Sequence, residues 1–243
     1  MEKTQTAAML VIGNELLSGK FEERNVAVLA RLLFSLGIQL QRVVICPDEV
    51  DVIAEDLQRL SASYDHVFTS GGVGPTHDDV TMAGVAASFG RSIARHPELE
   101  TLLREFFEVR LTSDHLRMAD VPQGVELLWV EGVKWPVVRL ENVFILPGLP
   151  EVFAMKMPVI RSHLQSGAAF FSRQVATLCD EGSMASPLQD LVDRFPEVRI
   201  GSYPIWGEEP RLVISFDGKS QDLVNEAAEA LIAGIPADKL LEE

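Results

Sequence analysis

The chain has few cysteines, few basic residues and no long apolar run, and each shortage excludes a class of protein. Its only cysteines, Cys46 and Cys179, form no C-x-x-C pair, so neither a zinc site nor a disulfide framework is indicated. The 36 Asp and Glu outnumber the 21 Lys and Arg, and the net charge of −15 would repel a polyanion. Nucleic acid is therefore not expected as a partner.

No apolar stretch approaches the roughly 20 residues that a membrane helix needs, so no membrane partner is expected. The first residues lead directly into a strand-like run over residues 7–12 and show no signal peptide. The sequence therefore predicts a cytoplasmic protein. With 243 residues, of which 47% are hydrophobic, it can form one large domain or two modest ones.

Apolar runs of strand length alternate with helical patterns along most of the chain. The spacing predicts strands over residues 7–12, 38–46, 64–70, 125–130, 136–140 and 143–146, and helices over 22–36, 48–61, 79–89 and from 97 onward. Alternation of this kind predicts an α/β fold in three layers, with a mostly parallel sheet and helices on both faces.

A linker-like sequence over residues 165–169 separates a smaller second part. Residues 169–243 have the order β-α-β-β-α of a small α+β module, so we expect two domains, 1–168 and 169–243. Residues 170–243 contain six Lys and Arg against fourteen Asp and Glu, and no Gly-x-x-Gly loop. This composition does not favour RNA binding.

The glycine-rich segment from Gly71 to Asp79 is the most informative part of the chain. A strand that ends in a glycine-rich turn before a helix is a place to hold phosphate, because backbone N–H groups and the helix dipole both favour negative charge. Glycines let the main chain approach phosphate oxygens closely. The adjacent acids Asp78 and Asp79 point to a divalent metal between the protein and the phosphate.

Two structural interpretations of this segment stay open. Thr76 and Asp79 fit a capping box, in which their side chains satisfy N–H groups at a helix start. The Gly-Gly-x-Gly-Pro sequence also fits an ordinary tight turn. The spacing alone does not decide between these interpretations and a phosphate site.

Three predicted loops follow strands of the parallel sheet, over residues 13–19, 47–49 and 71–79. Ligands of open α/β sheets bind outside the carboxyl ends of the strands, and each loop brings an acid there: Glu15, Asp48 and Asp79. The sequence therefore predicts a divalent metal held by Asp79 together with Asp48 or Glu15.

Three ordered blocks resemble a known family. The loop Gly71-Gly72-Val73-Gly74-Pro75-Thr76-His77-Asp78-Asp79 resembles the signature of the molybdopterin-binding domain superfamily, which includes molybdenum-cofactor biosynthesis proteins and the amino-terminal half of competence/damage-inducible A proteins. Two further blocks resemble segments of competence/damage-inducible A proteins. The first is Gly13-Asn14-Glu15-Leu16-Leu17-Ser18-Gly19 with Arg24-Asn25, and the second is Leu146-Pro147-Gly148-Leu149-Pro150. The nearest resemblance is to the hydrolase-like domain fused to eukaryotic FAD synthases. Asn14 and Val73 depart from the usual family residues, and the small module resembles a KH-like one.

The resemblance implies a metal-dependent pyrophosphatase acting on FAD or ADP-ribose-type diphosphates. Mg²⁺, Mn²⁺ or Co²⁺ is the implied cofactor, with K⁺ as a further candidate. Asp79, Glu15 and Asp78 are the expected catalytic residues, with Glu15 or Asp78 as general base. The residues expected to bind phosphate or ligand are Gly13, Asn14, Asn25, Ser70, Gly71, Gly72, Gly74, Pro75, Thr76, Pro147 and Gly148.

Two other functions stay open. The chain could hold a pterin or nucleotide without turnover, or it could adenylylate molybdopterin, as its biosynthetic relatives do. In each case the partner is a small molecule, and a homo-oligomer stays open. Arg117 could meet a ligand phosphate, but a surface or ion-paired arginine is favoured. Trp129 and Trp135 are interpreted as packing residues rather than as a platform for a flat ring.

Overall fold

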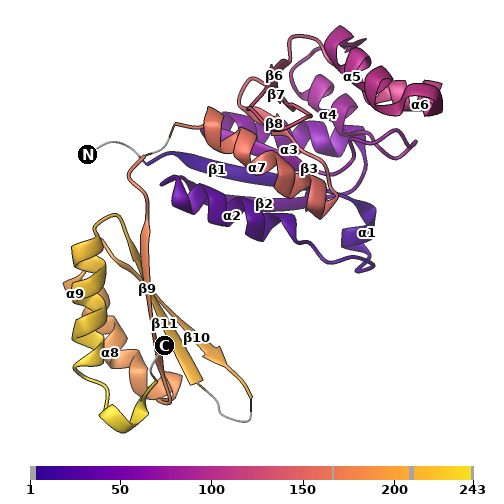
Figure 1. The fold of residues 1–243 in the computed structure, drawn as a ribbon. Helices are drawn as coiled ribbons and strands as arrows, with labels where there is room; N and C mark the ends of the chain where they lie inside the picture. Colours follow the sequence, from indigo (N-terminus) through magenta and orange to yellow (C-terminus); the bar gives the residue numbers. More distant parts are fainter. Residues whose placement is uncertain (1–3, 166, 208–210, 242–243) are drawn as a thin grey trace. The chain divides into compact units, whose positions relative to one another are not determined.

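The computed structural model describes residues 4–165, 167–207 and 211–241. The chain divides into two compact units, Met1–Gly167 and Ala168–Glu243 (Figure 1). Each unit has a hydrophobic core of its own.

The first unit is built on a six-stranded sheet. Its strands, in spatial order, are β2 (Gln39–Cys46), β1 (Thr6–Ile12), β3 (His66–Ser70), β8 (Val143–Ile145), β7 (Val137–Leu140) and β6 (Glu126–Leu128). The first four are parallel, and β7 and β6 continue the sheet in antiparallel fashion. The predicted α/β fold with a mostly parallel sheet is confirmed.

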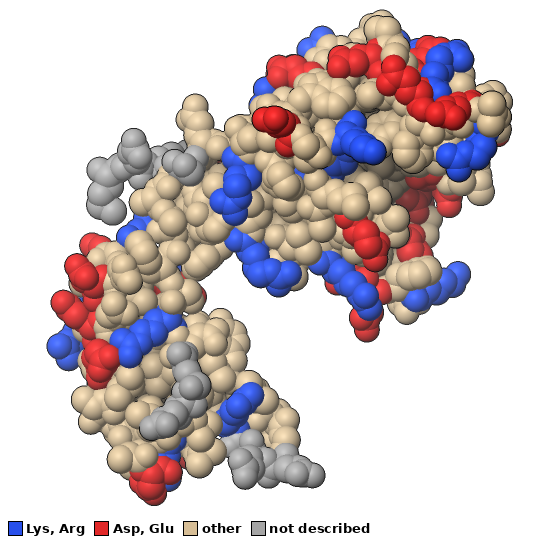
Figure 2. Space-filling model, viewed as in Figure 1, with Lys and Arg blue, Asp and Glu red and all other residues tan. Residues whose placement is uncertain are grey.

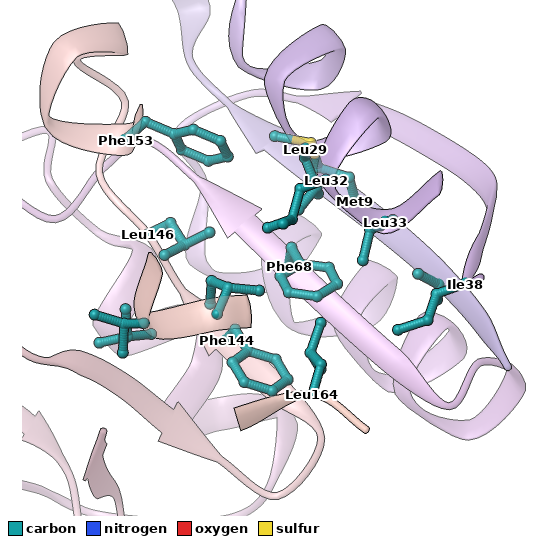
Figure 3. Close-up of a cluster of buried hydrophobic side chains, with 14 of the residues drawn as sticks. Met9, Leu29, Leu32, Leu33, Ile38, Phe68, Phe144, Leu146, Phe153 and Leu164 are labelled. Atoms are coloured by element: carbon teal, nitrogen blue, oxygen red, sulfur yellow. The ribbon is translucent and has the colours of Figure 1, made fainter. Parts of the chain in front are cut away.

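Helices cover both faces of this sheet. α2 (Asn25–Ser35) and α7 (Pro150–His163) pack on one face, and α3 (Val50–Ser63) and α4 (Thr81–Ser88) on the other. Side chains alternate along β1: Met9 joins Leu29, Phe68 and Phe153 in one core (Figure 3), while Leu10 joins Ile53 and Val85 in the opposite one. Because β1 is buried on both faces, its sequence is a continuous apolar run.

A smaller layer lies next to this sheet. It consists of α5 (Pro97–Phe107), a 3-10 turn at Glu108–Arg110, α6 (Ser113–Arg117) and a two-stranded sheet of β4 (Ile93–Arg95) and β5 (Asp120–Pro122). α5 starts with Pro97 and has acids in its first turn, as expected for a helix N-terminus. Its buried residues Leu99 and Leu103 belong to the same core as α3 and α4.

The helices predicted over 22–36, 48–61 and 79–89 each begin two or three residues later in the structure, and α1 and α7 were not predicted. α2 begins at Asn25 instead of residue 22, and the short α1 (Asn14–Leu17) lies in the loop after β1. α4 begins at Thr81 instead of residue 79, because the Thr81 hydroxyl donates to the carbonyl of Gly71 at 2.8 Å and its N–H donates to that of Gly72 at 3.0 Å. These bonds keep residues 72–80 in the loop.

The second unit is a four-stranded antiparallel sheet in the order β10 (Arg199–Ile205), β11 (Arg211–Gly218), β9 (Phe171–Thr177) and β12 (Leu240–Leu241). α8 (Glu181–Arg194) and α9 (Gln221–Ile232) pack on it through Leu191 and Ala228. The predicted β-α-β-β-α order is observed, followed by a 3-10 turn at Ala237–Lys239 and the added strand β12.

Basic and acidic side chains are interspersed over the face of the molecule shown in Figure 2. In the described part of the chain, no helix is both long and apolar enough to span a bilayer.

Candidate functional site

Four loops meet at the carboxyl edge of the parallel strands in the first unit. They follow β1 at Gly13, β2 at Pro47, β3 at Gly71 and β8 at Leu146. The first three were predicted to share this edge because each follows a strand that was expected in the parallel sheet. The fourth is the Leu-Pro-Gly turn, and the parallel pairing of β8 with β3 places it beside the glycine-rich loop. All of the expected site residues lie in these loops or at their ends.

Glycines allow three of these loops to pack backbone against backbone. Gly71 has a φ of +107°, and a Cβ at this position would lie 2.2 Å from the carbonyl oxygen of Ile12. A Cβ on Gly148 would lie 3.1 Å from the Cα of Gly71. The N–H of Gly71 donates to the carbonyl of Leu146 at 3.2 Å. Any larger residue at position 71 would force these loops apart.

Asn25 ties the glycine-rich loop to the Leu-Pro-Gly turn. Its Nδ2 donates to the Ser70 hydroxyl at 2.9 Å and to the carbonyl of Gly148 at 2.8 Å. The side chain is only 2% exposed, and its Oδ1 has no hydrogen-bond partner among the described residues. The structure therefore gives Asn25 a positioning role, with one buried acceptor left unused.

The Asp79 carboxylate is fixed inside the glycine-rich loop. Its Oδ2 accepts the N–H of Thr76 at 2.8 Å and the hydroxyl of Thr76 at 2.5 Å. A Cβ on Gly74 would lie 2.6 Å from the same oxygen. These bonds close the loop before α4, whose N-cap is Val80 and has no side-chain cap. The predicted capping box for this helix is therefore wrong.

Asp48 and Glu15 both lie against the loop that follows β1. Asp48 Oδ2 accepts the N–H of Asn14 at 2.8 Å, at the start of α1. The Glu15 carboxylate folds back over Gly13, where a Cβ would lie 2.5 Å from Oε1. Asp48 is half-buried and Glu15 is exposed. Two carboxylates, one from this loop and one from the loop after β2, thus lie at the sheet edge.

Asp78 differs from its neighbour Asp79 because it is exposed. Hydrogen bonding by Thr76 and by its own backbone N–H lowers the pKa of the Asp78 carboxyl from its ordinary value. Asp78 is therefore a carboxylate over the whole physiological pH range.

The three predicted metal ligands do not form a preformed metal-binding group. Among residues 4–165, 167–207 and 211–241, no three His, Cys, Asp or Glu side chains form a group able to hold a metal ion. Mg²⁺ is commonly held by one or two carboxylates, with substrate phosphates and water as the other ligands. Single carboxylates beside the glycine-rich loop fit that mode. Asp79 Oδ1, which accepts no hydrogen bond in the described part of the chain, is a suitable oxygen.

Arg117 approaches the glycine-rich loop from α6. Its guanidinium donates to the carbonyl of Pro75 at 3.3 Å and is otherwise exposed. Arg117 is thus a surface arginine, as the favoured interpretation held, and its bond to the glycine-rich loop was not predicted. The sequence offered no signal for this contact beyond the scarcity of cations in that region.

A largely apolar pocket of about 390 Å³ opens beside the glycine-rich loop. Its lining includes Val73 of that loop and Pro147 of the Leu-Pro-Gly turn. Leu103 and Phe106 of α5, Lys156 of α7 and Trp135, just before β7, also line it. Trp135 packs edge-to-face on Phe106 with ring centroids 5.3 Å apart, so it both packs and faces the pocket.

Lys156 was not expected from the sequence. It lies on α7 and is only 8% exposed. Its ammonium donates to the carbonyls of Trp135 and Pro136, both at 2.9 Å, and burial lowers its pKa from 10.5 to about 8. The only signal in the sequence was a lysine between apolar residues in a segment for which no helix was predicted.

The family model described as "Probable molybdopterin binding domain" matches residues 8–163, and this range contains the four loops. The chain belongs to the molybdopterin-binding domain family. Residues 169–243 match a second model, the middle domain of FAD synthase, and so cover almost all of the second unit. The resemblance drawn from the three sequence blocks is confirmed.

Relatives share both parts of this chain. A protein of Aeropyrum pernix is 34% identical, over 96% of this chain and 92% of its own length. A probable FAD synthase of Caenorhabditis briggsae is 32% identical over 82% of this chain, but the match spans only 43% of the synthase. The crystal structure of the protein CinA from Thermoplasma acidophilum matches 65% of this chain and 97% of its own, with 26% identity and a TM-score of 0.59.

Proposed function

We propose that this member of the molybdopterin-binding domain family is a divalent-metal-dependent pyrophosphatase acting on FAD or ADP-ribose-type diphosphates. The observation that carries the proposal is the placement of the Asp79 carboxylate against Gly74, within a glycine-rich loop at the carboxyl edge of the sheet. The loop offers N–H groups to a phosphate, and the carboxylate offers an oxygen to a cation bridging to it. The sequence similarity to FAD synthases supports a dinucleotide as substrate.

In the proposed reaction, water attacks a phosphorus of the diphosphate and the bridging P–O bond breaks. With FAD the products are AMP and FMN, and the water supplies the oxygen and protons that they gain. A bound divalent ion neutralises phosphate charge and lowers the pKa of the attacking water. Backbone N–H groups of Gly72 and Gly74 stabilise the charge that develops on the phosphate.

The remaining residues hold the substrate or move the proton. Glu15 or Asp78 takes the proton from water, and each is an exposed carboxylate next to the loops. Asp79 and Asp48 would hold the divalent cation. Asn25 acts indirectly, because its amide fixes the positions of Ser70 and Gly148.

The test is AMP release from FAD, ADP-ribose and NAD, each with Mg²⁺, Mn²⁺ or Co²⁺ and with or without K⁺. We expect metal-dependent AMP from one of these compounds and its loss in Asp79→Asn. The asparagine keeps an oxygen that can accept from Thr76, so the loop stays closed while the charge is removed. Asp114→Asn, at an exposed aspartate on α6, is the matched control and should keep full activity.

Full activity in Asp79→Asn would overturn the assigned role of this carboxylate. A second candidate function, the binding of a pterin or nucleotide without turnover, is favoured by one observation. The described residues contain no preformed group of three metal ligands. Measurable nucleotide binding without AMP release under any of the metal conditions would select it. Transfer of AMP from ATP to a pterin would select adenylylation instead.

A further inference from the structure

The short helix α6 is capped by a histidine. Thr112 precedes the helix, and its hydroxyl accepts the backbone N–H of His115 at 3.3 Å. In return, Nδ1 of His115 accepts the backbone N–H of Thr112 at 3.1 Å and lies 3.1 Å from the Thr112 hydroxyl. Such a reciprocal pair is a capping box, in which the second side chain is usually glutamate or glutamine. A histidine in this place makes the cap depend on protonation.

The geometry fixes which nitrogen of the His115 ring carries the hydrogen. A backbone N–H can only donate, so Nδ1 is an unprotonated acceptor and the hydrogen of the neutral ring lies on Nε2. A protonated imidazole has N–H groups at both positions and accepts at neither. Imidazole side chains change their charge roughly between pH 5 and 8. The bond from Thr112 to His115 is therefore present only while the ring is neutral.

The His115 ring is held from a second side by α5. It stacks on Phe107, with ring centroids 3.9 Å apart and planes inclined by 15°, and the side chain is half-buried. This stack does not require a neutral ring, because an aromatic face also attracts a cation. Protonation therefore removes the bond to Thr112 and leaves the contact with Phe107.

α6 carries Arg117 to the glycine-rich loop. The helix has only five residues, so it makes less than two turns and its capped first turn forms most of it. Arg117 is the last of these residues, and its guanidinium donates to the carbonyl of Pro75 at 3.3 Å. The position of this guanidinium thus depends on the helix that the cap stabilises.

We propose that His115 is a positioning residue, whose neutral imidazole caps α6 and so holds Arg117 where it can meet a phosphate at the glycine-rich loop. Protonation of His115 releases the cap and withdraws Arg117. The inference rests on the proposed function in one respect, that this loop binds the phosphate of the substrate. Phosphate affinity then has one part that is present while the ring is neutral and is lost as the pH falls.

The charged groups around His115 do not pair with it. Among the described residues, no ion pair includes its ring. The charged side chains next to it along the chain are Arg104 and Glu105 of α5, Glu108 and Arg110 of the 3-10 turn, and Asp114 and Arg117 of α6. All six are exposed, so screening by solvent weakens their effect on the ring.

A second imidazole lies in the glycine-rich loop itself. The Nδ1 atom of His77 is 4.0 Å from Oδ1 of Asp78, and the His77 side chain is exposed. A positive charge on His77 would attract a phosphate at low pH, which is opposite in sign to the effect expected of His115. The experiment must therefore compare variants of His115 at the same pH, so that the contribution of His77 cancels.

The test measures ribose 5-phosphate binding by calorimetry at low salt, at pH 5.8 and at pH 7.8, for the parent and two variants. His115→Gln keeps an acceptor that does not titrate and gives the usual capping box. His115→Phe keeps a flat ring on Phe107 but has no acceptor. The phosphate of the ligand also gains a proton near pH 6, and this contribution is the same for all variants.

We expect the parent to bind like His115→Gln at pH 7.8 and at least about twofold more weakly at pH 5.8, as for the loss of a helix cap. His115→Phe should be weaker than His115→Gln by this factor at both pH values. The factor should not exceed the loss caused by Arg117→Ala, because the proposed effect acts through Arg117. His163→Gln, at an exposed histidine of α7, is the matched control and should keep the pH profile of the parent.

A double variant separates positioning from a general effect on the fold. When Arg117 is alanine, histidine and glutamine at position 115 should bind ribose 5-phosphate equally at each pH. A difference that persists without Arg117 would overturn the inference. The same pH dependence in the parent and in His115→Gln would also overturn it, even if the protein releases AMP.

Nitrogen NMR of the free protein tests the cap without a ligand. The His115 ring should carry its hydrogen on Nε2 at pH 7.8, and the Thr112 amide and the Arg117 Nε signals should shift together as the ring gains a proton. A hydrogen on Nδ1 of the neutral ring would overturn the inference. If these signals behave as expected in a protein that neither binds ribose 5-phosphate nor releases AMP, the hold of His115 on Arg117 stands and the proposed function is rejected.

Discussion

The side-chain amide of Asn25 donates to the backbone carbonyl of Gly148 at 2.8 Å, although 123 positions separate the two residues in the chain. The same amide group also donates to Ser70, at the end of the strand that leads into the glycine-rich loop. One buried side chain thus joins the start of α2, the end of β3 and the turn after β8. The geometry of the proposed phosphate site depends on this junction.

Replacing Asn25 with alanine should therefore lower both stability and ligand affinity. Gly148 and Ser70 would each lose a hydrogen bond in a buried or half-buried setting, which costs about 1–3 kcal/mol. Urea unfolding should show this loss, and titration with AMP should show weaker binding because the loops are no longer held together.

Asn14→Ala is the control for stability, because Asn14 is exposed at the start of α1. Its free energy of unfolding should stay within about 0.5 kcal/mol of the parent. Equal stabilities for the two variants would show that the Asn25 hydrogen bonds do not hold the junction.

A methyl group at position 74 should disturb the carboxylate of Asp79 more than it disturbs the fold. The added Cβ would lie 2.6 Å from Oδ2 of Asp79, so this flexible side chain must move. Gly74 does not have a positive φ, so the alanine adds no strain of that kind. We expect Gly74→Ala to lose at least tenfold in metal-dependent AMP release, with a change in unfolding free energy of about 1 kcal/mol or less.

Gly207→Ala is the matched control for this prediction. No atom lies within 4 Å of a Cβ built at Gly207, so this variant should change neither activity nor stability. If Gly74→Ala retains full activity, the position of the Asp79 carboxylate does not matter for turnover.

The sequence predicted this sheet edge well because the positions of the strands along the chain follow from patterns within single segments. The apolar run over residues 7–12 indicates a strand buried on both faces. The glycines at 71, 72 and 74 indicate a loop whose backbone is closely approached by other atoms. Loops after parallel strands must then meet at one edge, whatever their length. The placement of Glu15, Asp48 and Asp79 near this edge needed no knowledge of side-chain contacts.

The contacts that shape the site were not predictable in this way. Arg117 donates a hydrogen bond to the carbonyl of Pro75, 42 positions away in the sequence, and Lys156 donates one to the carbonyl of Trp135, 21 positions away. Such pairs depend on how α6 and α7 pack, which no local pattern specifies. The start of α4 was also misplaced, because the bonds of Thr81 to Gly71 and Gly72 override the helix signal at Asp79.

Arg117 should contribute to phosphate binding through its charge. Its guanidinium is held at the glycine-rich loop by a single bond to the Pro75 carbonyl, which leaves other N–H groups able to meet a phosphate. Arg117→Ala should weaken ribose 5-phosphate binding by about three- to tenfold at low salt, and by less at high salt because screening reduces the contribution of charge.

Arg110→Ala, at another exposed arginine of the same unit, is the control and should bind like the parent. An equal loss in both variants would indicate a general effect of net charge. No loss in either would remove Arg117 from the phosphate site.

Lys156 should make the stability of the protein depend on pH above neutrality. Burial lowers the pKa of this lysine to about 8 in the folded state, from an ordinary value of 10.5. Between these values the unfolded chain binds a proton that the folded chain does not, so the free energy of unfolding rises with pH. Below pH 8 the buried ammonium lowers the free energy of unfolding by its full amount. By about pH 10.5 this loss of stability has disappeared.

Urea unfolding of the parent and of Lys156→Met at pH 7 and pH 10 measures this effect, because contributions from other groups cancel in the difference. The parent should gain up to about 3 kcal/mol relative to the variant as the pH rises. Lys134→Met should show no such gain, since its side chain is exposed. A constant difference between parent and Lys156→Met would mean that the bonds to Trp135 and Pro136 offset the burial of the charge. In that case the ammonium would stay protonated at alkaline pH as well and would keep its bonds to both carbonyls.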